Sequence, residues 1–342
     1  MKRTIIIAEA GVNHNGDIAL AKQLIDVAAD AGADYVKFQT FKADKLVSRT
    51  AKQAAYQVKN QKRQSDDTQY SMLKKLELSE ENHFVLQAYA SDRGVKFLST
   101  GFDPESIDFL DQIGIDLFKV PSGEITNKPY LEQIAKKGKA VVLSTGMATL
   151  QEVKDAISVL MKEGLNKEDI SVLHCNTEYP TPMGDVNLRA MLAIRDSLGV
   201  KVGYSDHTLG IEVPIAAVAL GAVIIEKHYT LDKELPGPDH KASLSPQELK
   251  DMVLAIRNIE QALSGSTEKE PSASELKNRE LIRKSIYYNS ALTKGTVIGE
   301  DHLIMMRPAT GISPMEVDSV VGKALKSDVE QGQIVSFDDF EQ

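Results

Sequence analysis

The stretch that decides the fold is residues 202–229, which read VGYSDHTLGIEVPIAAVALGAVIIEKHY. Two short apolar runs end in His207 and His228, and one helix-like run, residues 211–220, separates them. This spacing corresponds to about one helix and one strand, so a parallel α/β protein would place both imidazoles on the same rim of its sheet. Two neutral imidazoles there can bind a divalent metal. The alternative for each histidine is a buried residue with an ordinary hydrogen-bond partner.

The same alternation of strand-like and helix-like runs extends over most of the chain. Eight runs are predicted as strands, namely residues 4–8, 35–39, 96–99, 117–120, 140–144, 170–175, 201–204 and 222–226. Between them lie helix-like runs such as residues 18–31, whose apolar residues share one face. Eight such units over about 250 residues predict a (β/α)8 TIM barrel. A doubly wound open sheet is the alternative, but no Gly-x-Gly-x-x-Gly follows the first strand.

Length and composition limit the functions open to the chain. Its 342 residues suffice for a large barrel with a small appendage, and its net charge of −9 argues against a nucleic-acid surface. The single cysteine, Cys175, excludes an intrachain disulfide framework. No apolar run reaches the roughly 20 residues of a membrane span, and no signal-peptide pattern is present. We therefore expect a cytoplasmic protein that binds neither nucleic acid nor membranes.

The composition of the chain changes after the last predicted barrel helix, residues 246–264. Residues 265–282 are rich in Ser, Glu and Lys and are predicted to form a linker. Residues 283–342 contain short strand-like runs broken by glycine, so we predict a catalytic barrel over residues 1–264 followed by a small β-rich domain. Within the barrel, the polar segment 41–78 is too long for an ordinary loop. It is either a substrate-covering segment or a solvated insertion.

In a barrel, residues at the C-terminal ends of the strands converge on one site. Lys37 and Lys119 lie inside apolar strands, where a lysine needs a partner, although a lone lysine is more often a solvated surface residue. With neutral donors on the same rim, these lysines make a cage for a phosphate-bearing anion. Glu9, Glu124 and Asp239 supply carboxylates for proton handling or metal contact. The remaining rim residues are Gln39, Thr100, Ser122, Ser144, Asn176, Tyr179, Ser205 and Glu226. Cys175 is interpreted as structural.

Nine motifs, in order along nearly the whole chain, resemble those of the sialic acid synthases. These are phosphoenolpyruvate-dependent synthases of N-acetylneuraminate and related nonulosonic acids. The motifs are IAEAGVNHNG (7–16), VKFQT (36–40), FKVPSGE (118–124), LSTGM (143–147), HCNTEYPTP (174–182), GYSDHT (203–208), EKH (226–228), GPDHKAS (237–243) and RP (307–308). Two positions differ from the family pattern. Ala309-Thr310-Gly311 stands where Gly-Asn-Gly is more common, and Gly101 stands where proline is common.

The resemblance implies a barrel followed by an antifreeze-like (SAF) domain, which in the family reaches the partner subunit of a domain-swapped homodimer. It implies a divalent metal, usually Mn²⁺ with Mg²⁺ or Co²⁺ as alternatives, on His207 and His228. The implied phosphoenolpyruvate ligands are Lys37, Thr100, Lys119, Ser122, Ser144, Asn176 and Ser205. Arg307 of the other subunit would contact an acetamido sugar, and Gln39 and Tyr179 complete the predicted substrate-binding set.

The expected reaction joins phosphoenolpyruvate to open-chain N-acetylmannosamine, giving N-acetylneuraminate and phosphate. The alternative substrate is 2,4-diacetamido-2,4,6-trideoxymannose, which would give N,N'-diacetyllegionaminate. From other classes, we consider a metal-dependent pyruvate aldolase, a Schiff-base aldolase using Lys119, and a carbohydrate- or ice-binding role for the C-terminal domain alone. Glu9 is predicted either to deprotonate the attacking water or to orient the sugar hydroxyls.

Overall fold

The computed structural model describes residues 3–53 and 68–341. The chain forms two compact units, Met1–Gly265 and Ser266–Gln342. Eight parallel strands make up the sheet of the first unit: β1 (Ile5–Gly11), β2 (Tyr35–Thr40), β3 (Lys96–Gly101), β4 (Leu117–Val120), β5 (Ala140–Ser144), β6 (Ile170–Cys175), β7 (Lys201–Asp206) and β8 (Ile224–His228). The first strand pairs with both the second and the eighth, which confirms a barrel and excludes the open doubly wound sheet.

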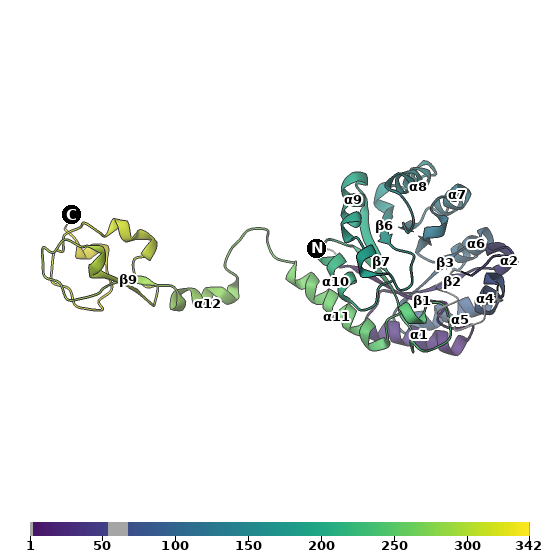
Figure 1. The fold of residues 1–342 in the computed structure, drawn as a ribbon, viewed down its shortest axis with the longest axis horizontal. Helices are drawn as coiled ribbons and strands as arrows, with labels where there is room; N and C mark the ends of the chain where they lie inside the picture. Colours follow the sequence, from purple (N-terminus) through teal and green to yellow (C-terminus); the bar gives the residue numbers. More distant parts are fainter. Residues whose placement is uncertain (1–2, 54–67, 342) are drawn as a thin grey trace. The chain divides into compact units, whose positions relative to one another are not determined.

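The barrel is nearly closed. The hydrogen-bonded strands follow the order β3-β2-β1-β8-β7-β6-β5-β4. The two end strands of this order, β3 and β4, lie next to each other without forming a hydrogen-bonded ladder. Helices surround the strands (Figure 1). They are α1 (Ile18–Ala31), α5 (Glu80–Asp92), α6 (Pro104–Gln112), α7 (Lys128–Ala135), α8 (Leu150–Lys162), α9 (Leu188–Leu198), α10 (Glu212–Ala219) and α11 (Pro246–Ala262).

Helix α1 illustrates how the sequence specifies these elements. Its buried residues, Ala21, Leu24, Ile25, Ala28 and Ala31, form the apolar face that the spacing predicts. The Asp17 side chain accepts hydrogen bonds from the first backbone N–H groups, and Gly32 ends the helix with a left-handed φ of 78°. Because both strand faces are covered, the strands are almost uniformly buried, as expected for a parallel barrel.

The described part of the polar segment 41–78 contains two short helices and a small apolar cluster. It contains α2 (Ala43–Leu46) and α4 (Gln69–Leu76), while residues 54–67 lie outside the described part of the chain. Phe41, Met72 and Leu76 form a small apolar cluster, against which Phe102 packs edge-on to Phe41. Since Phe102 lines the main pocket, the described part of this segment supports one pocket wall.

The second unit is a small β-rich domain. Strands β9 (Ser285–Tyr288) and β10 (Leu303–Met306) pair antiparallel over a compact apolar core that includes Ile286, Tyr288 and Leu325. Helix α12 (Ala273–Ile282) occupies part of the stretch whose composition predicts a linker. Ser272 and Glu275 form a capping box at its start, a local signal that the polar composition obscures. None of the helices in the described residues is long and apolar enough to cross a membrane.

Candidate active site

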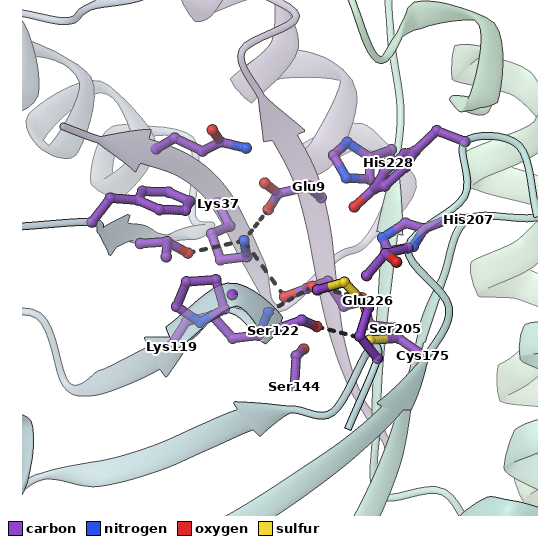
Figure 2. Close-up of a pocket in the computed structure, with 18 of the residues that line it drawn as sticks. Glu9, Lys37, Lys119, Ser122, Ser144, Cys175, Ser205, His207, Glu226 and His228 are labelled. Atoms are coloured by element: carbon purple, nitrogen blue, oxygen red, sulfur yellow. Dashed lines mark hydrogen bonds and ion pairs between the residues drawn. The ribbon is translucent and has the colours of Figure 1, made fainter. Parts of the chain in front are cut away.

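A pocket of about 480 Å³ opens at the C-terminal ends of the barrel strands. Eleven of the residues predicted for the site line it: Glu9, Lys37, Gln39, Thr100, Lys119, Ser122, Ser144, Tyr179, Ser205, His207 and His228. Figure 2 shows the two lysines and the two histidines around the same space. The prediction that strand-end residues from distant parts of the chain converge is therefore confirmed.

Strand register explains how these side chains come together. Glu9 lies opposite Lys37 on one side and opposite His228 on the other, so β2, β1 and β8 present one layer of three site residues. A bulge between Glu9 and Gly11 shifts the register at the pocket end of β1. Gly11 has a left-handed φ of 52°, and a Cβ there would approach both Glu9 and His228 within about 3.3 Å. The position therefore favours glycine and keeps this corner of the pocket open.

Two ammonium groups and two carboxylates form a buried network on the pocket floor. Lys37 Nζ lies 2.5 Å from Glu9 Oε2 and 3.6 Å from Glu226 Oε2, and it donates to Thr100 Oγ1 at 3.2 Å. Glu226 Oε1 accepts hydrogen bonds from Lys119 at 3.0 Å and from Ser205 at 2.8 Å (Figure 2). Each lysine carries three N–H donors. The three contacts of Lys37 use its donors, whereas Lys119 contacts only Glu226 in this network and keeps donors for a bound anion.

The two carboxylates differ in protonation. Burial raises the pKa of Glu9 to about 7, against the opposing effect of Lys37. Burial alone would also raise the pKa of Glu226, but Lys119 and Lys37 outweigh it and hold that pKa well below its usual range. Glu226 is therefore a permanent anion between the two lysines, whereas Glu9 can exchange a proton near neutral pH. The buried Ser144 hydroxyl has no hydrogen-bond partner in the described part of the chain, so it is available to a ligand.

His207 and His228 face each other across a ring-centroid distance of 5.4 Å. Burial lowers the pKa of His207 to about 4 and the pKa of His228 well below its usual value, so both imidazoles are neutral at neutral pH. His207 Nδ1 is hydrogen bonded to the Asn176 carbonyl at 2.5 Å, which leaves Nε2 for a ligand. His228 Nδ1 is buried without a partner in the described residues. Tyr179 stacks on His207 at 4.0 Å and contacts His228 edge-on.

These features fit a divalent metal bound through two imidazoles. The described residues contain no group of three or more metal-ligating side chains, so the remaining coordination positions would be open to substrate or water. An open coordination sphere is typical of catalytic metal sites rather than structural ones.

Four residues predicted for the site do not line the pocket. Glu124 accepts a hydrogen bond from Asn127, and Arg307 is an exposed residue of the second unit. The Asn176 side chain accepts from the Glu178 N–H at 2.7 Å, which builds a turn, and only its main-chain carbonyl reaches His207. Asp239 is buried beside the pocket, where burial raises its pKa to about 7.

Two of the other residues that line the pocket, Glu226 and Cys175, make polar contacts there but were not predicted as catalytic, substrate-binding or metal-binding residues. Glu226 is the centre of the ion-pair network, and the two-residue alternation along β8 places it on the same face as His228. Cys175 Sγ lies 3.2 Å from Ser122 Oγ, whose oxygen also accepts from the Gly146 N–H. The neighbouring His174 contacts the Val186 carbonyl instead.

Comparison with known proteins gives matches along the whole chain. A model of the NeuB family matches residues 24–269, and a model of the SAF domain matches residues 283–341. The N,N'-diacetyllegionaminic acid synthase of Campylobacter jejuni is 50% identical, covering 98% of this chain and 99% of that protein. The human N-acetylneuraminate-9-phosphate synthase is 36% identical, covering 96% and 90%. The crystal structure of a Leptospira borgpetersenii N-acetylneuraminic acid synthetase superposes with a TM-score of 0.70 at 35% identity, covering 81% and 90%.

Proposed function

Because this chain belongs to the NeuB family, we propose that it condenses phosphoenolpyruvate with 2,4-diacetamido-2,4,6-trideoxymannose to give N,N'-diacetyllegionaminate and phosphate. At the coarser level it is a phosphoenolpyruvate-dependent nonulosonic acid synthase, an enzyme of carbohydrate biosynthesis. One observation carries the choice of sugar, namely the greater identity to a legionaminic acid synthase than to an N-acetylneuraminate-9-phosphate synthase. The comparison thus favours the alternative substrate over N-acetylmannosamine, the substrate expected first.

The lysine cage supports the phosphoenolpyruvate part of the proposal. Lys37 supplies positive charge and Lys119 keeps unused N–H donors, and the Thr100, Ser122, Ser144 and Ser205 hydroxyls surround the same space. In a buried site, these groups bind a multiply charged anion far more strongly than they would in water. Glu226 orients both ammonium groups beforehand, so the cage is arranged before the substrate arrives.

His207 and His228 are the proposed ligands of a divalent metal, with Mn²⁺ the first choice and Mg²⁺ or Co²⁺ the alternatives. When bound there, the metal would act as a Lewis acid toward the sugar aldehyde. The protein supplies the orientation. The Asn176 carbonyl fixes the tautomer of His207, and the Tyr179 ring covers both imidazoles.

The reaction balances with one water molecule. C3 of phosphoenolpyruvate forms a bond to the aldehyde carbon, whose oxygen takes up a proton. Water adds at C2 and loses a proton, and the C2–O bond then breaks, so that phosphate leaves with the bridging oxygen. We assign the proton of the attacking water to Glu9, because its pKa of about 7 lets it accept a proton at neutral pH.

An aldolase is the second candidate, and the geometry disfavours it. A Schiff base requires Lys119 as a free amine, but its ammonium group is bound to Glu226 in a buried pair. A pyruvate aldolase has no need for two lysines with surrounding hydroxyls. Phosphoenolpyruvate labelled with ¹⁸O in the bridging position tests the proposal, because a pyruvate aldolase would release no phosphate from it. The proposal expects the label in the released phosphate. Label retained in the organic product, or a borohydride-trapped adduct on Lys119, would contradict it.

We also propose that the active enzyme is a domain-swapped homodimer in which Arg307 of one subunit contacts the sugar bound by the other. The support is the SAF domain and the exposure of Arg307 in the second unit. Ser285 Oγ donates to the Pro308 carbonyl and accepts from the Gly311 N–H, so the loop after Arg307 has a defined shape. Ala309 and Thr310 lie in this loop and are candidates for distinguishing the acetamido sugars.

A further inference from the structure

A buried ion pair lies directly behind the two proposed metal ligands. Asp206 precedes His207 at the end of β7, and Lys227 precedes His228 at the end of β8. Because side chains alternate along a strand, Asp206 and Lys227 point away from the pocket, and neither lines it. Both side chains are completely inaccessible to solvent. No other ion pair of the described residues has both side chains at 0% exposure.

The contacts of this pair tie the two strand ends together. Asp206 and Lys227 lie opposite each other in the parallel ladder, and Lys227 Nζ lies 2.5 Å from Asp206 Oδ2. Lys227 also donates to the Thr208 carbonyl at 2.5 Å. The Asp206 carboxylate accepts from the Thr208 N–H and from its hydroxyl, each at 3.0 Å. His207 is therefore the middle residue of a closed turn whose two flanking residues both bind Lys227.

Stability alone gives little reason for charges at this position. Removing two charges from water costs several kcal/mol per ion, and well-packed apolar residues of similar volume often serve as well or better. What an ion pair with four directed contacts does supply is a single geometry. Here that geometry fixes the main chain on either side of His207 and immediately before His228.

We infer that Asp206 and Lys227 are positioning residues, which set the separation and orientation of the His207 and His228 imidazoles for metal binding. The inference rests on the proposed metal role of those histidines. With only two protein ligands in the described part of the chain, the site has no third side chain to correct a misplaced imidazole. The opposite side of His207 is held as well, because its carbonyl accepts from the Thr181 N–H at 2.9 Å.

The test measures Mn²⁺ affinity in the full-length protein without substrate, by the electron paramagnetic resonance signal of free Mn²⁺. Asp206→Asn and Lys227→Met are expected to weaken binding about 10- to 100-fold, the range for residues that support metal ligands. The matched control is Asp34→Asn, which breaks the partly buried Asp34–Arg257 pair at the start of the barrel strands. It should lower stability and leave Mn²⁺ affinity within about twofold.

A double variant separates positioning from general stabilisation. Asp206→Leu with Lys227→Met replaces the pair by apolar residues and should recover most of the stability lost in the single variants. A positioning role predicts that Mn²⁺ affinity stays at least tenfold low in this variant. Recovery of both stability and affinity would overturn the inference. If the single variants do not fold, Thr208→Val, which removes only the hydroxyl donor to Asp206, is expected to weaken Mn²⁺ binding about threefold with the fold intact.

The outcomes also separate this inference from the proposed function. If folded Asp206→Asn and Thr208→Val variants bind Mn²⁺ as tightly as the wild type, the positioning role is refuted. That result would not contradict the proposed metal site. Absence of Mn²⁺ binding by the wild-type protein would refute the metal site, and the positioning role with it.

Discussion

On the floor of the barrel pocket, the ammonium group of Lys119 donates a hydrogen bond to the carboxylate of Glu226 over 3.0 Å. The same carboxylate also pairs with Lys37, so one anion organises both cations of the site. In the absence of a ligand, Glu226 provides the negative charge that these buried lysines require. A bound phosphoenolpyruvate brings negative charge to the same lysines.

This relationship predicts the behaviour of Glu226→Gln. The substitution leaves two buried lysines with one carboxylate, so the free energy of unfolding should fall by about 3 kcal/mol. Saturating phosphoenolpyruvate replaces the missing charge and should therefore raise the melting temperature more in Glu226→Gln than in the wild type. Thermal unfolding with and without phosphoenolpyruvate checks this. Glu260→Gln, far along the chain beside Arg257, is the control, with an unchanged ligand-induced shift. Equal ligand-induced shifts of the melting temperature in the wild type and in Glu226→Gln would contradict the proposal that phosphoenolpyruvate binds beside these two lysines.

The proposed metal site predicts the effect of His207→Ala. Loss of one of two protein ligands should weaken Mn²⁺ binding by well over tenfold, because even residues that only support a ligand contribute that much. The apo fold should survive, since neighbouring contacts of the turn come from Asp206 and Thr208. Calorimetric titration with Mn²⁺ measures the affinity. His174→Ala, a histidine that contacts Val186 outside the pocket, should bind Mn²⁺ like the wild type. A loss below tenfold for His207→Ala would show that it is not a ligand.

The raised pKa of Glu9 predicts a pH-dependent stability difference between the metal-free wild type and Glu9→Gln. The unfolded chain loses the Glu9 proton near pH 4.5, whereas the folded protein keeps it to about pH 7. Between these values the unfolded state binds fewer protons, so the wild type loses stability as pH rises. Relative to Glu9→Gln, it should lose about 3 kcal/mol by pH 7 and change little above it.

Denaturant unfolding of both proteins from pH 4.5 to 8.5 measures this difference. The comparison with Glu9→Gln is needed because the neutral histidines change the stability of the protein with pH in the opposite direction. The lowered pKa values of His207 and His228 cost stability as pH falls below about 6.5, in the wild type and in the variant alike. A wild-type advantage that grows with pH would mean that Lys37 lowers the pKa of Glu9 more than burial raises it.

The fold was predictable because its signals are local and repeat eight times. The site was predictable only where side chains act directly from strand ends, as for Lys37 and His228. The first and last strands were predicted to end too early, because polar residues such as Glu9 and His228 continue the ladder when the barrel interior is a polar pocket. Sequence also does not show that the main-chain carbonyl of Asn176 contacts His207 while its side chain forms a turn. Ion pairs across the barrel, such as Lys119–Glu226, join residues too distant for any spacing rule.

The proposed homodimer predicts complementation between two inactive variants. His207→Ala should lack metal binding, and Arg307→Ala should bind phosphoenolpyruvate and Mn²⁺ normally but bind the sugar poorly. When the subunits are mixed equally and exchanged, half of the dimers are mixed. In each of these, an intact barrel of one chain meets an intact Arg307 of the other, which should restore about a quarter of the wild-type rate. No recovery after verified subunit exchange would place Arg307 in the site of its own chain or outside any site.

The most direct test of the central claim is a phosphate-release assay with phosphoenolpyruvate and Mn²⁺ against a panel of acetamido sugars. The panel includes 2,4-diacetamido-2,4,6-trideoxymannose, N-acetylmannosamine and N-acetylmannosamine 6-phosphate, with product identity checked by mass spectrometry. We predict that kcat/KM for the diacetamido sugar exceeds that for the other two at least tenfold, a difference of about 1.4 kcal/mol in transition-state binding. Equal or faster turnover of N-acetylmannosamine would contradict the proposed substrate, and no phosphate release with any sugar would contradict the proposed reaction.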